Sequence, residues 1–333
     1  MNTISEDAEN NNSDLQDFSI DDSAITSAVV ADSNHSPADE AELILEDAPK
    51  GDYQELFVAF IDLLGFSQIV MRTSSHSGHA DPTGFRRATR EEIFAALSSI
   101  PADDYRSLFR ARYLDDTYTD SQLQLGVAGF SDTIMFWADM RPETFGLLVH
   151  AIFQTVRQFT LRGFYCRGGI KLGEVLVDST GYKSGHRASP IIFGPAVIQA
   201  YKLEQRNAES ARTILCNNST QFLNNSCLTS PVPELLRGFF NDYLFQSADG
   251  PWQIDIFADL RAPLEQESET VKNTIATISD KLSRVMAEYT ESPAVFRKLL
   301  MLAKSFNSAL DEAHKRPNFD FMKNYVIALP KGR

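Results

Sequence analysis

The sequence FVAFIDLLGFS, residues 57–67, sets the fold that we expect for this chain. Five apolar residues precede Asp62 and Gly65 follows it, so the pattern predicts a buried strand that ends at Asp62 and turns through a glycine into a helix. A carboxylate beside a buried strand needs a cation or hydrogen bonds, because burying an unpaired charge is costly. A metal ion meets that need. On this segment alone, an Asp that caps the next helix is the alternative.

A second carboxylate has a similar setting further along the chain. In LQLGVAGFSDTIMFW, residues 123–137, two apolar arms flank a short polar turn that holds Asp132. This pattern is typical of a tight hairpin inside a core, so Asp132, like Asp62, is expected at a strand junction. Arg167 stands at the start of the next predicted strand, Tyr165–Val177.

The predicted elements follow one another as strand, helix, hairpin, helix, strand, helix, strand, which fits an α+β sandwich of the ferredoxin type. A helix opens at Pro142, and its apolar residues recur at spacings of three and four, so they face the core. The charged connection Pro101–Asp120 is expected to be irregular. The other expected elements are helices at Ser67–Arg72, Glu91–Ser98, Gly194–Arg206, Val271–Tyr289 and Pro293–His314, and strands at Thr213–Cys216, Tyr243–Gln246 and Trp252–Phe257.

Composition divides the chain into three parts. Residues 1–52 are rich in Asp, Glu, Asn and Ser and are predicted to form a disordered acidic tail. Residues 53–262 are expected to form the core domain, and residues 263–333 a helical appendix. The formal net charge is −14, and residues 1–50 hold 13 Asp and Glu against one Lys, so the remainder is nearly neutral. The lack of a basic excess argues against a nucleic-acid duplex as partner.

The cysteines and the apolar runs indicate the compartment. Cys166, Cys216 and Cys227 have neither the even number of a disulfide framework nor the paired spacing of a zinc site, so we expect buried thiols in a reducing compartment. The N-terminus lacks the basic-then-apolar order of a secretory signal, and no apolar run approaches the roughly twenty residues that span a bilayer. We therefore expect a cytoplasmic protein without membrane association.

The two carboxylates indicate a chemistry. In a ferredoxin-type sheet the first strand and the hairpin are neighbours, so Asp62 and Asp132 can reach one ion. Paired carboxylates suit Mg²⁺ or Mn²⁺, which take oxygen ligands and leave positions open for phosphate oxygens. This is the logic of two-metal phosphoryl and nucleotidyl transfer.

Four segments resemble class III nucleotidyl cyclases, most closely the bacterial pyrimidine cyclases of the Pycsar anti-phage system. They are FIDLLGF at 60–66, FSD at 130–132, RGGIKLGE at 167–174 and FGPAVIQAYKLE at 193–204. Each segment is short, but together they follow the family order between residues 57 and 216.

The resemblance implies a set of site residues and a homodimer. Asp62 and Asp132, with the backbone carbonyl of Leu63, would hold two divalent ions, Mn²⁺ or Mg²⁺, in each site. Arg167 would pair with the terminal phosphates, and the site would lie between two protomers. Backbone N–H groups at a helix start would hold the triphosphate; this triphosphate turn consists of Leu64, Gly65, Phe66 and Ser67.

Some positions depart from the family pattern. Where many cyclases carry an Asn and an Arg that bind the ribose and the transition-state phosphate, this chain has Ile198 and Lys202. Lys202 keeps the charge but loses the bidentate fork, and Ile198 cannot donate a hydrogen bond, so either Arg206 helps or the transition state is held differently. The positions that read adenine in the family fall at Ala128 and Ile191, neither of which makes a polar contact.

The missing purine-reading pair implies a pyrimidine. We expect a uridylate cyclase that converts UTP to 3′,5′-cyclic UMP and pyrophosphate, as the signal-producing enzyme of an anti-phage system with a separate effector that the cyclic nucleotide activates. A cytidylate cyclase that makes cyclic CMP is one alternative, and a degenerate cyclase-like module that binds nucleotide without turnover is another. A polymerase-palm relative or a phosphohydrolase is a further alternative, which the lack of an adjacent pair of acids in the hairpin turn counts against.

Overall fold

The computed structural model describes residues 52–67, 70, 91–92, 102–178, 190–208, 210–229, 231–261, 269–315 and 320–330. The acidic tail predicted over residues 1–52 lies outside these residues except for Asp52. Most of the helices predicted at Ser67–Arg72 and Glu91–Ser98 also lie outside them. These segments therefore stay predictions.

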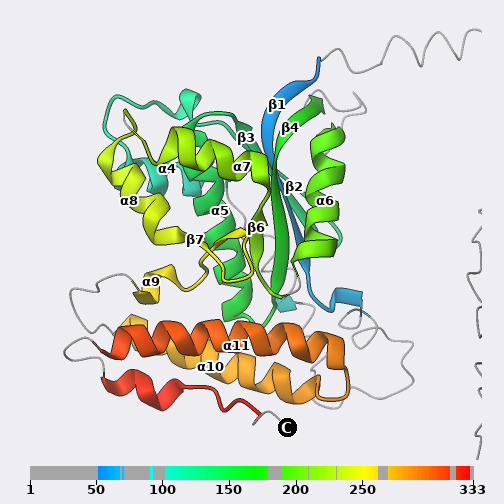
Figure 1. Cartoon of the computed structure of the whole chain (residues 1–333), viewed down its shortest axis with the longest axis vertical. Coiled ribbons are helices and arrows are strands. Elements are labelled where there is room, and N and C mark those ends of the chain that lie inside the picture. Colours follow the sequence, from blue (N-terminus) through cyan, green and yellow to red (C-terminus); the bar gives the residue numbers. More distant parts are fainter. Residues whose placement is uncertain are drawn as a thin grey trace, which may run out of the picture. The chain divides into compact units, whose positions relative to one another are not determined.

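The centre of the fold is an antiparallel sheet built from two strands and a hairpin (Figure 1). Its elements are β1 (Gln54–Leu63), α4 (Ala102–Tyr113), β2 (Leu125–Phe130), β3 (Thr133–Asp139), α5 (Pro142–Leu161) and β4 (Cys166–Asp178). The strand order is β2-β3-β1-β4, and each neighbouring pair is antiparallel. With α4 in the first crossover and α5 in the second, this is the ferredoxin-like arrangement. The predicted α+β fold class is confirmed.

A second group of strands extends the sheet beyond β4. The strands are β5 (Ile191–Phe193), β6 (Thr213–Leu215), β7 (Leu244–Gln246) and β8 (Trp252–Ile254). Helix α6 (Pro195–Asn207) lies between β5 and β6 in the chain. Strand β6 runs parallel to β4, β8 and β7 continue the sheet in antiparallel fashion, and β5 pairs with the far end of β4. The observed bounds of α6 and β6 lie within one residue of the predicted ones.

The segment predicted to be an irregular connection, residues 101–120, contains a helix, and the prediction was wrong there. Helix α4 holds Tyr105, Phe109 and Tyr113 four residues apart, and all three residues are buried. A spacing of four places them on one face of the helix, which packs against α5. Charged residues separate these aromatic positions in the sequence, so the overall composition of the segment suggested an exposed connection.

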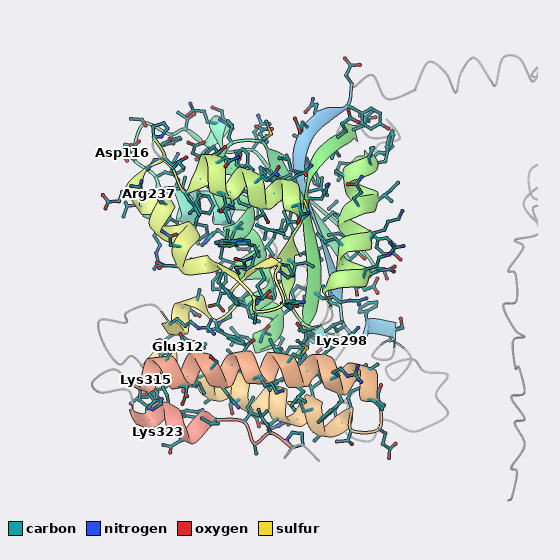
Figure 2. The ribbon with its side chains drawn as sticks, viewed as in Figure 1. Asp116, Arg237, Lys298, Glu312, Lys315 and Lys323 are labelled. Atoms are coloured by element: carbon teal, nitrogen blue, oxygen red, sulfur yellow. The ribbon has the colours of Figure 1, made fainter. Side chains whose placement is uncertain are left out.

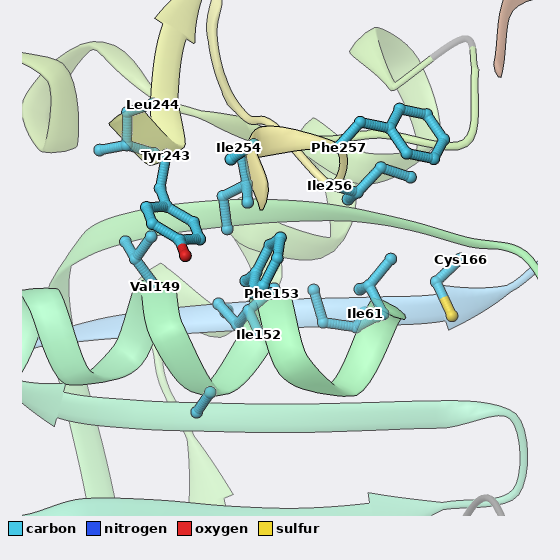
Figure 3. Packing of buried hydrophobic residues seen from close by; sticks show 14 of the residues in the cluster. Ile61, Val149, Ile152, Phe153, Cys166, Tyr243, Leu244, Ile254, Ile256 and Phe257 are labelled. Carbon is cyan, nitrogen blue, oxygen red and sulfur yellow. The ribbon is translucent and has the colours of Figure 1, made fainter. Parts of the chain in front are cut away.

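The side chains of β1 alternate between two apolar layers. Phe57, Ala59 and Ile61 lie in the main core on the α5 side of the sheet, where the ring centroid of Phe57 is 4.4 Å from that of Phe145. Figure 3 shows Ile61 in this layer together with Ile152 and Phe153 of α5. Burial of one such aromatic side chain contributes about 1.5–3 kcal/mol. Leu56 and Val58 instead contact residues of a smaller cluster on the α6 side. Since side chains alternate along a strand, Asp62 belongs to the α6 side.

Two helices cross below the ends of β1 and β4 in Figure 1. They are α10 (Glu269–Glu288) and α11 (Pro293–His314), which follow the short helix α9 (Ala258–Arg261) and precede the 3₁₀ helix η5 (Asp320–Tyr325). Helix α10 packs against α5, α11 packs against α9, and their buried side chains belong to the same cluster as Phe57. None of the helices within the described residues combines the length and the apolar character that crossing a bilayer requires.

All three cysteines are free thiols. Cys166 at the start of β4 and Cys227 are buried, as predicted, whereas Cys216 is half-buried and forms the N-cap of a helix. This region, which was left unassigned by the sequence, comprises α7 (Asn217–Phe222), a π-helical turn (Leu223–Cys227) and α8 (Glu234–Tyr243).

His150 on α5 is a buried histidine surrounded by aromatic rings. The residue is 4% exposed, its two ring nitrogens have no hydrogen-bond partner among the residues that the structure describes, and the ring centroids of Phe109 and Phe239 lie about 6 Å from that of the imidazole. Burial, assisted by the charge of Arg112, lowers the pKa of His150 to about 4. The neutral imidazole is therefore the form that the folded protein tolerates.

His150 is expected to make the protein sensitive to acid. Above pH 6.5 the residue is neutral in both states and has no effect. Between pH 6.5 and about 4 only the unfolded chain takes up the proton, so the free energy of unfolding falls by up to about 3 kcal/mol. In His150→Leu this part of the decline is expected to vanish. Urea unfolding of both proteins from pH 7.5 to 4.5 measures it, and equal declines would contradict the assignment.

Candidate functional site

Asp62 and Arg167 meet across the first two strands of the core. Strand register pairs them directly, and Nε of Arg167 lies 3.3 Å from Oδ2 of Asp62. Their side chains are 20% and 18% exposed. The carboxylate that the apolar run of β1 would otherwise leave unpaired is thus held by a guanidinium group.

A third charged group, Glu204 of α6, completes the cluster. Its carboxylate forms an ion pair with Nε of Arg167, and its side chain is 1% exposed. Ala196, Ala200 and Glu204 follow one another at intervals of four, and all three are buried, so they share the face of α6 that lies on the sheet. The buried face of this helix therefore ends on a carboxylate.

Gly169 allows α6 to come this close. A Cβ atom at Gly169 would lie 2.6 Å from the carbonyl oxygen of Ala200 and 3.1 Å from the backbone nitrogen of Glu204. Any larger residue would press on the helix backbone. The glycine in β4 thus sets the distance over which Glu204 reaches Arg167.

The three charges perturb one another. Burial raises the pKa of Asp62, and the charge of Asp132 adds to this, while Arg167 acts in the opposite direction. Burial likewise raises the pKa of Glu204 to about 7, against the lowering effect of Arg167. One guanidinium thus forms ion pairs with two carboxylates, and burial disfavours the charged form of both. A second cation or a bound ligand would relieve this imbalance.

Asp132 lies beside Asp62 at the hairpin. Ser131 has a φ of 55°, a left-handed conformation that helps to close the two-residue turn between β2 and β3. The amide of Leu63 donates to the backbone carbonyl of Asp132 at 3.1 Å, which ties the turn to the end of β1. The structure therefore brings the Asp132 turn to the end of β1, and the charge of Asp132 acts on Asp62.

The donor set fits a hard divalent cation that shares its coordination with a substrate. No group of three or more His, Cys, Asp or Glu side chains within the described ranges could form a closed metal site. Mg²⁺ is commonly bound by one or two carboxylates plus substrate phosphates and water, rather than by an all-protein cage. Two half-buried carboxylates, Asp62 and Asp132, match that mode of binding.

The segment predicted to be the triphosphate turn forms a turn in the structure, and one of its four amides is already hydrogen-bonded. Gly65 has a φ of +76°, which favours glycine, and the chain enters a helical turn at Phe66 and Ser67. The amide of Leu64, however, donates to the carbonyl of Tyr165 at 2.8 Å. That amide is committed to the sheet, so the amides of the three following residues are the ones left to bind an anion.

Lys202 and Ile191 are not brought to Asp62 of the same chain. Lys202 is exposed and lies two residues from Ala200, on the opposite side of α6. Ile191 pairs with Asp178, eleven residues along β4 from Arg167, which corresponds to about 35 Å at the rise of a strand. Their predicted roles therefore cannot be played within one protomer.

A separate cavity of about 540 Å³ lies between the β7–β8 hairpin and α11. Arg212 and Arg261 on its wall are paired with Asp249 and Asp255, respectively. None of the residues of the Asp62 cluster lines this cavity, so its size is no guide to the chemistry described above.

Comparison with known proteins adds little to this geometry. No protein-family model matches the sequence, and no curated protein matches it. A solved structure of a class III adenylyl cyclase-like ATP-binding protein from Pseudomonas aeruginosa aligns with 83% of this chain and 72% of its own, at 12% sequence identity and a TM-score of 0.29. At that score we draw no conclusion about this chain from the alignment.

Two charged residues near this cluster were not predicted from the sequence. Glu204 could have been found, because it continues the buried spacing of Ala196 and Ala200. Lys298 of α11 interacts electrostatically with Asp62, Arg167 and Glu204, and no local pattern in the sequence indicates it. The cluster therefore includes a contribution from the C-terminal helices.

Proposed function

We propose that this protein is a nucleotidyl cyclase that converts UTP to 3′,5′-cyclic UMP and pyrophosphate. The observation that supports it best is the junction of Asp62, Asp132 and Arg167 beside the Gly65 turn. Two carboxylates, a guanidinium and a set of backbone amides are the groups that a metal-bound triphosphate needs. The four sequence segments that resemble pyrimidine cyclases supply the reaction and the base.

The chain's own residues divide the work. Asp62 and Asp132 would hold the divalent ions, and the amides of Gly65, Phe66 and Ser67 would bind the phosphates. Bound Mn²⁺ or Mg²⁺ would supply a lowered pKa for the ribose 3′-hydroxyl and charge neutralisation for pyrophosphate. The hydroxyl would lose its proton to solvent and attack the α-phosphorus in line, the bond between the α-phosphorus and the oxygen that bridges to the β-phosphate would break, and pyrophosphate would leave.

Arg167 has to change partners on substrate binding. Its guanidinium forms ion pairs with Asp62 and Glu204. Asp62 would turn to the divalent ions, and the terminal phosphates would take its place on the guanidinium, because carboxylate and phosphate are both bidentate oxygen acceptors. Glu204 would then hold the guanidinium in position from behind.

A homodimer would complete the site. Lys202 is exposed on the side of α6 away from Ala200, and Ile191 lies at the far end of β4 from Arg167, so a role of these residues in the reaction would require the Asp62 of a second copy. Apolar side chains on β5 and α6 are 39–56% exposed, and a second copy would cover them; they are Ile191, Phe193, Ile198 and Tyr201.

The signalling role follows from the product. A cyclic pyrimidine nucleotide is a diffusible signal, so we propose that a separate effector protein responds to it during anti-phage defence. We also retain the expectation of a cytoplasmic enzyme.

Two observations favour a second candidate, a module that binds nucleotide without turnover. Arg167 is paired with a carboxylate that is 1% exposed, and Ile198 stands where a hydrogen-bond donor is expected. Such a protein would bind the triphosphate through the same turn and leave it intact.

Incubation of the purified protein with Mn²⁺ and each of the four nucleoside triphosphates tests the proposal. The expected result is cyclic UMP from UTP, separated by chromatography, with at least about tenfold less product from the purine triphosphates. Cyclic CMP as the main product would select the cytidylate alternative. Cyclic AMP would contradict the interpretation of Ala128 and Ile191. Tight binding of UTP without consumption would favour the binding module.

A further inference from the structure

The corner between α10 and α11 lies against the triphosphate turn. A Cβ atom built on Gly65 would lie 3.3 Å from the hydroxyl oxygen of Tyr289, which stands between the two helices. Leu64 and Phe66 pack against the cluster to which Tyr289 belongs. Residues more than 200 positions apart in the sequence therefore meet at this turn.

Lys298 lies on the first half of α11, where the helix passes below the ends of β1 and β4 (Figure 2). It is half-buried, and it makes no ion pair within 4 Å with any residue that the structure describes. It nevertheless interacts electrostatically with Arg167, Glu204 and Asp62. An ammonium group beside this cluster that has no ion-pair partner among the described residues can bind an anion.

The charges around Lys298 indicate where that anion would sit. Burial lowers the pKa of Lys298, and the nearby Arg167 lowers it further, so the two cations repel each other. Glu204 and Asp62 act in the opposite direction, but both already share the guanidinium of Arg167. A polyanion bound between Lys298 and Arg167, beside the amides of Gly65, Phe66 and Ser67, would relieve the repulsion and form ion pairs with both cations.

We propose that the α10–α11 hairpin forms part of the nucleotide site within the same chain, with Lys298 binding the terminal phosphates opposite Arg167 and Tyr289 supporting the Gly65 turn. The inference rests on the proposed function, and it adds a phosphate-binding group from the C-terminal helices.

The test compares binding of two ligands to the full-length protein by calorimetry in Mn²⁺. The first ligand is 3′-deoxy-UTP, which lacks the attacking hydroxyl and cannot be cyclised; the second is UMP, which lacks the terminal phosphates. Lys298→Gln is expected to raise the Kd for 3′-deoxy-UTP about tenfold or more and to leave the Kd for UMP unchanged. Lys298→Arg, which keeps the charge, is expected to stay within about threefold of wild type.

Lys304→Gln serves as the matched control, because Lys304 is an exposed lysine on the same helix. It is expected to bind both ligands as the wild type does. If Lys298→Gln binds 3′-deoxy-UTP like the wild type, or loses both ligands equally, the phosphate role of Lys298 is overturned while the proposed function stands. If wild-type protein binds no triphosphate, the proposed function itself fails.

Discussion

Asp62→Asn is expected to lower the rate of cyclic nucleotide formation by at least about 100-fold. The amide cannot supply the anionic oxygen that a divalent ion needs, although it preserves the shape of the carboxylate. Folding is expected to survive, because burial already raises the pKa of Asp62 and the neutral side chain is well tolerated there. Arg167 also keeps its ion pair with Glu204. Chromatographic product assays with UTP and Mn²⁺ measure the effect.

Glu55→Gln is the control for this experiment. Glu55 lies on the same strand and is exposed, so the change removes one carboxylate at a distance from the site. We expect it to retain wild-type activity. A thermal unfolding midpoint for each variant separates lost chemistry from lost structure. Undiminished product from Asp62→Asn would overturn the assignment of this carboxylate.

Gly169→Ala is expected to destabilise the fold by about 1–3 kcal/mol, the usual range for overfilling a tightly packed contact. The added methyl group would lie 2.6 Å from the carbonyl oxygen of Ala200, and this obstacle is helix backbone, which cannot rotate away. Helix α6 must therefore move off the sheet. We expect a weaker pairing of Glu204 with Arg167 as a second consequence.

Gly129→Ala provides the matched control for this change. Gly129 is also a strand glycine, but a Cβ atom there would meet no atom within 4 Å. Replacing glycine in a strand should then leave stability unchanged or slightly raise it, because alanine loses less entropy on folding. Urea unfolding curves of the two variants give the comparison. Equal midpoints would mean that α6 yields to the added methyl group at no cost.

The centre of the fold was predictable because its local patterns agree. The apolar run before Asp62, the hairpin around Asp132 and the strand from Cys166 each have the periodicity of buried strands, and their order allows few arrangements. Together they place Asp62 beside Arg167 and Asp132, which is what the register shows. Helix α4 was missed because its aromatic positions are spread among arginines and aspartates.

The partners of these residues were not predictable in the same way. Glu204 forms an ion pair with Arg167, and the amide of Leu64 donates a hydrogen bond to the carbonyl of Tyr165. Ile191 pairs with the far end of β4. Each of these facts depends on how two elements pack. A local motif specifies which side chain a strand end carries, but it contains no information about which helix covers it.

By itself, the sequence determined the strand that ends on Asp62, the hairpin that carries Asp132 and the α+β class, because alternation and turn residues act over a few neighbouring positions. Only the tertiary structure decided that Arg167 is shared with Glu204 and that Lys298 faces the same cluster. Asp62 and Arg167 are 105 positions apart, and such charges meet only after strand register and helix packing have formed. The free energy of keeping these groups charged depends on their burial, and that burial exists only in the folded chain.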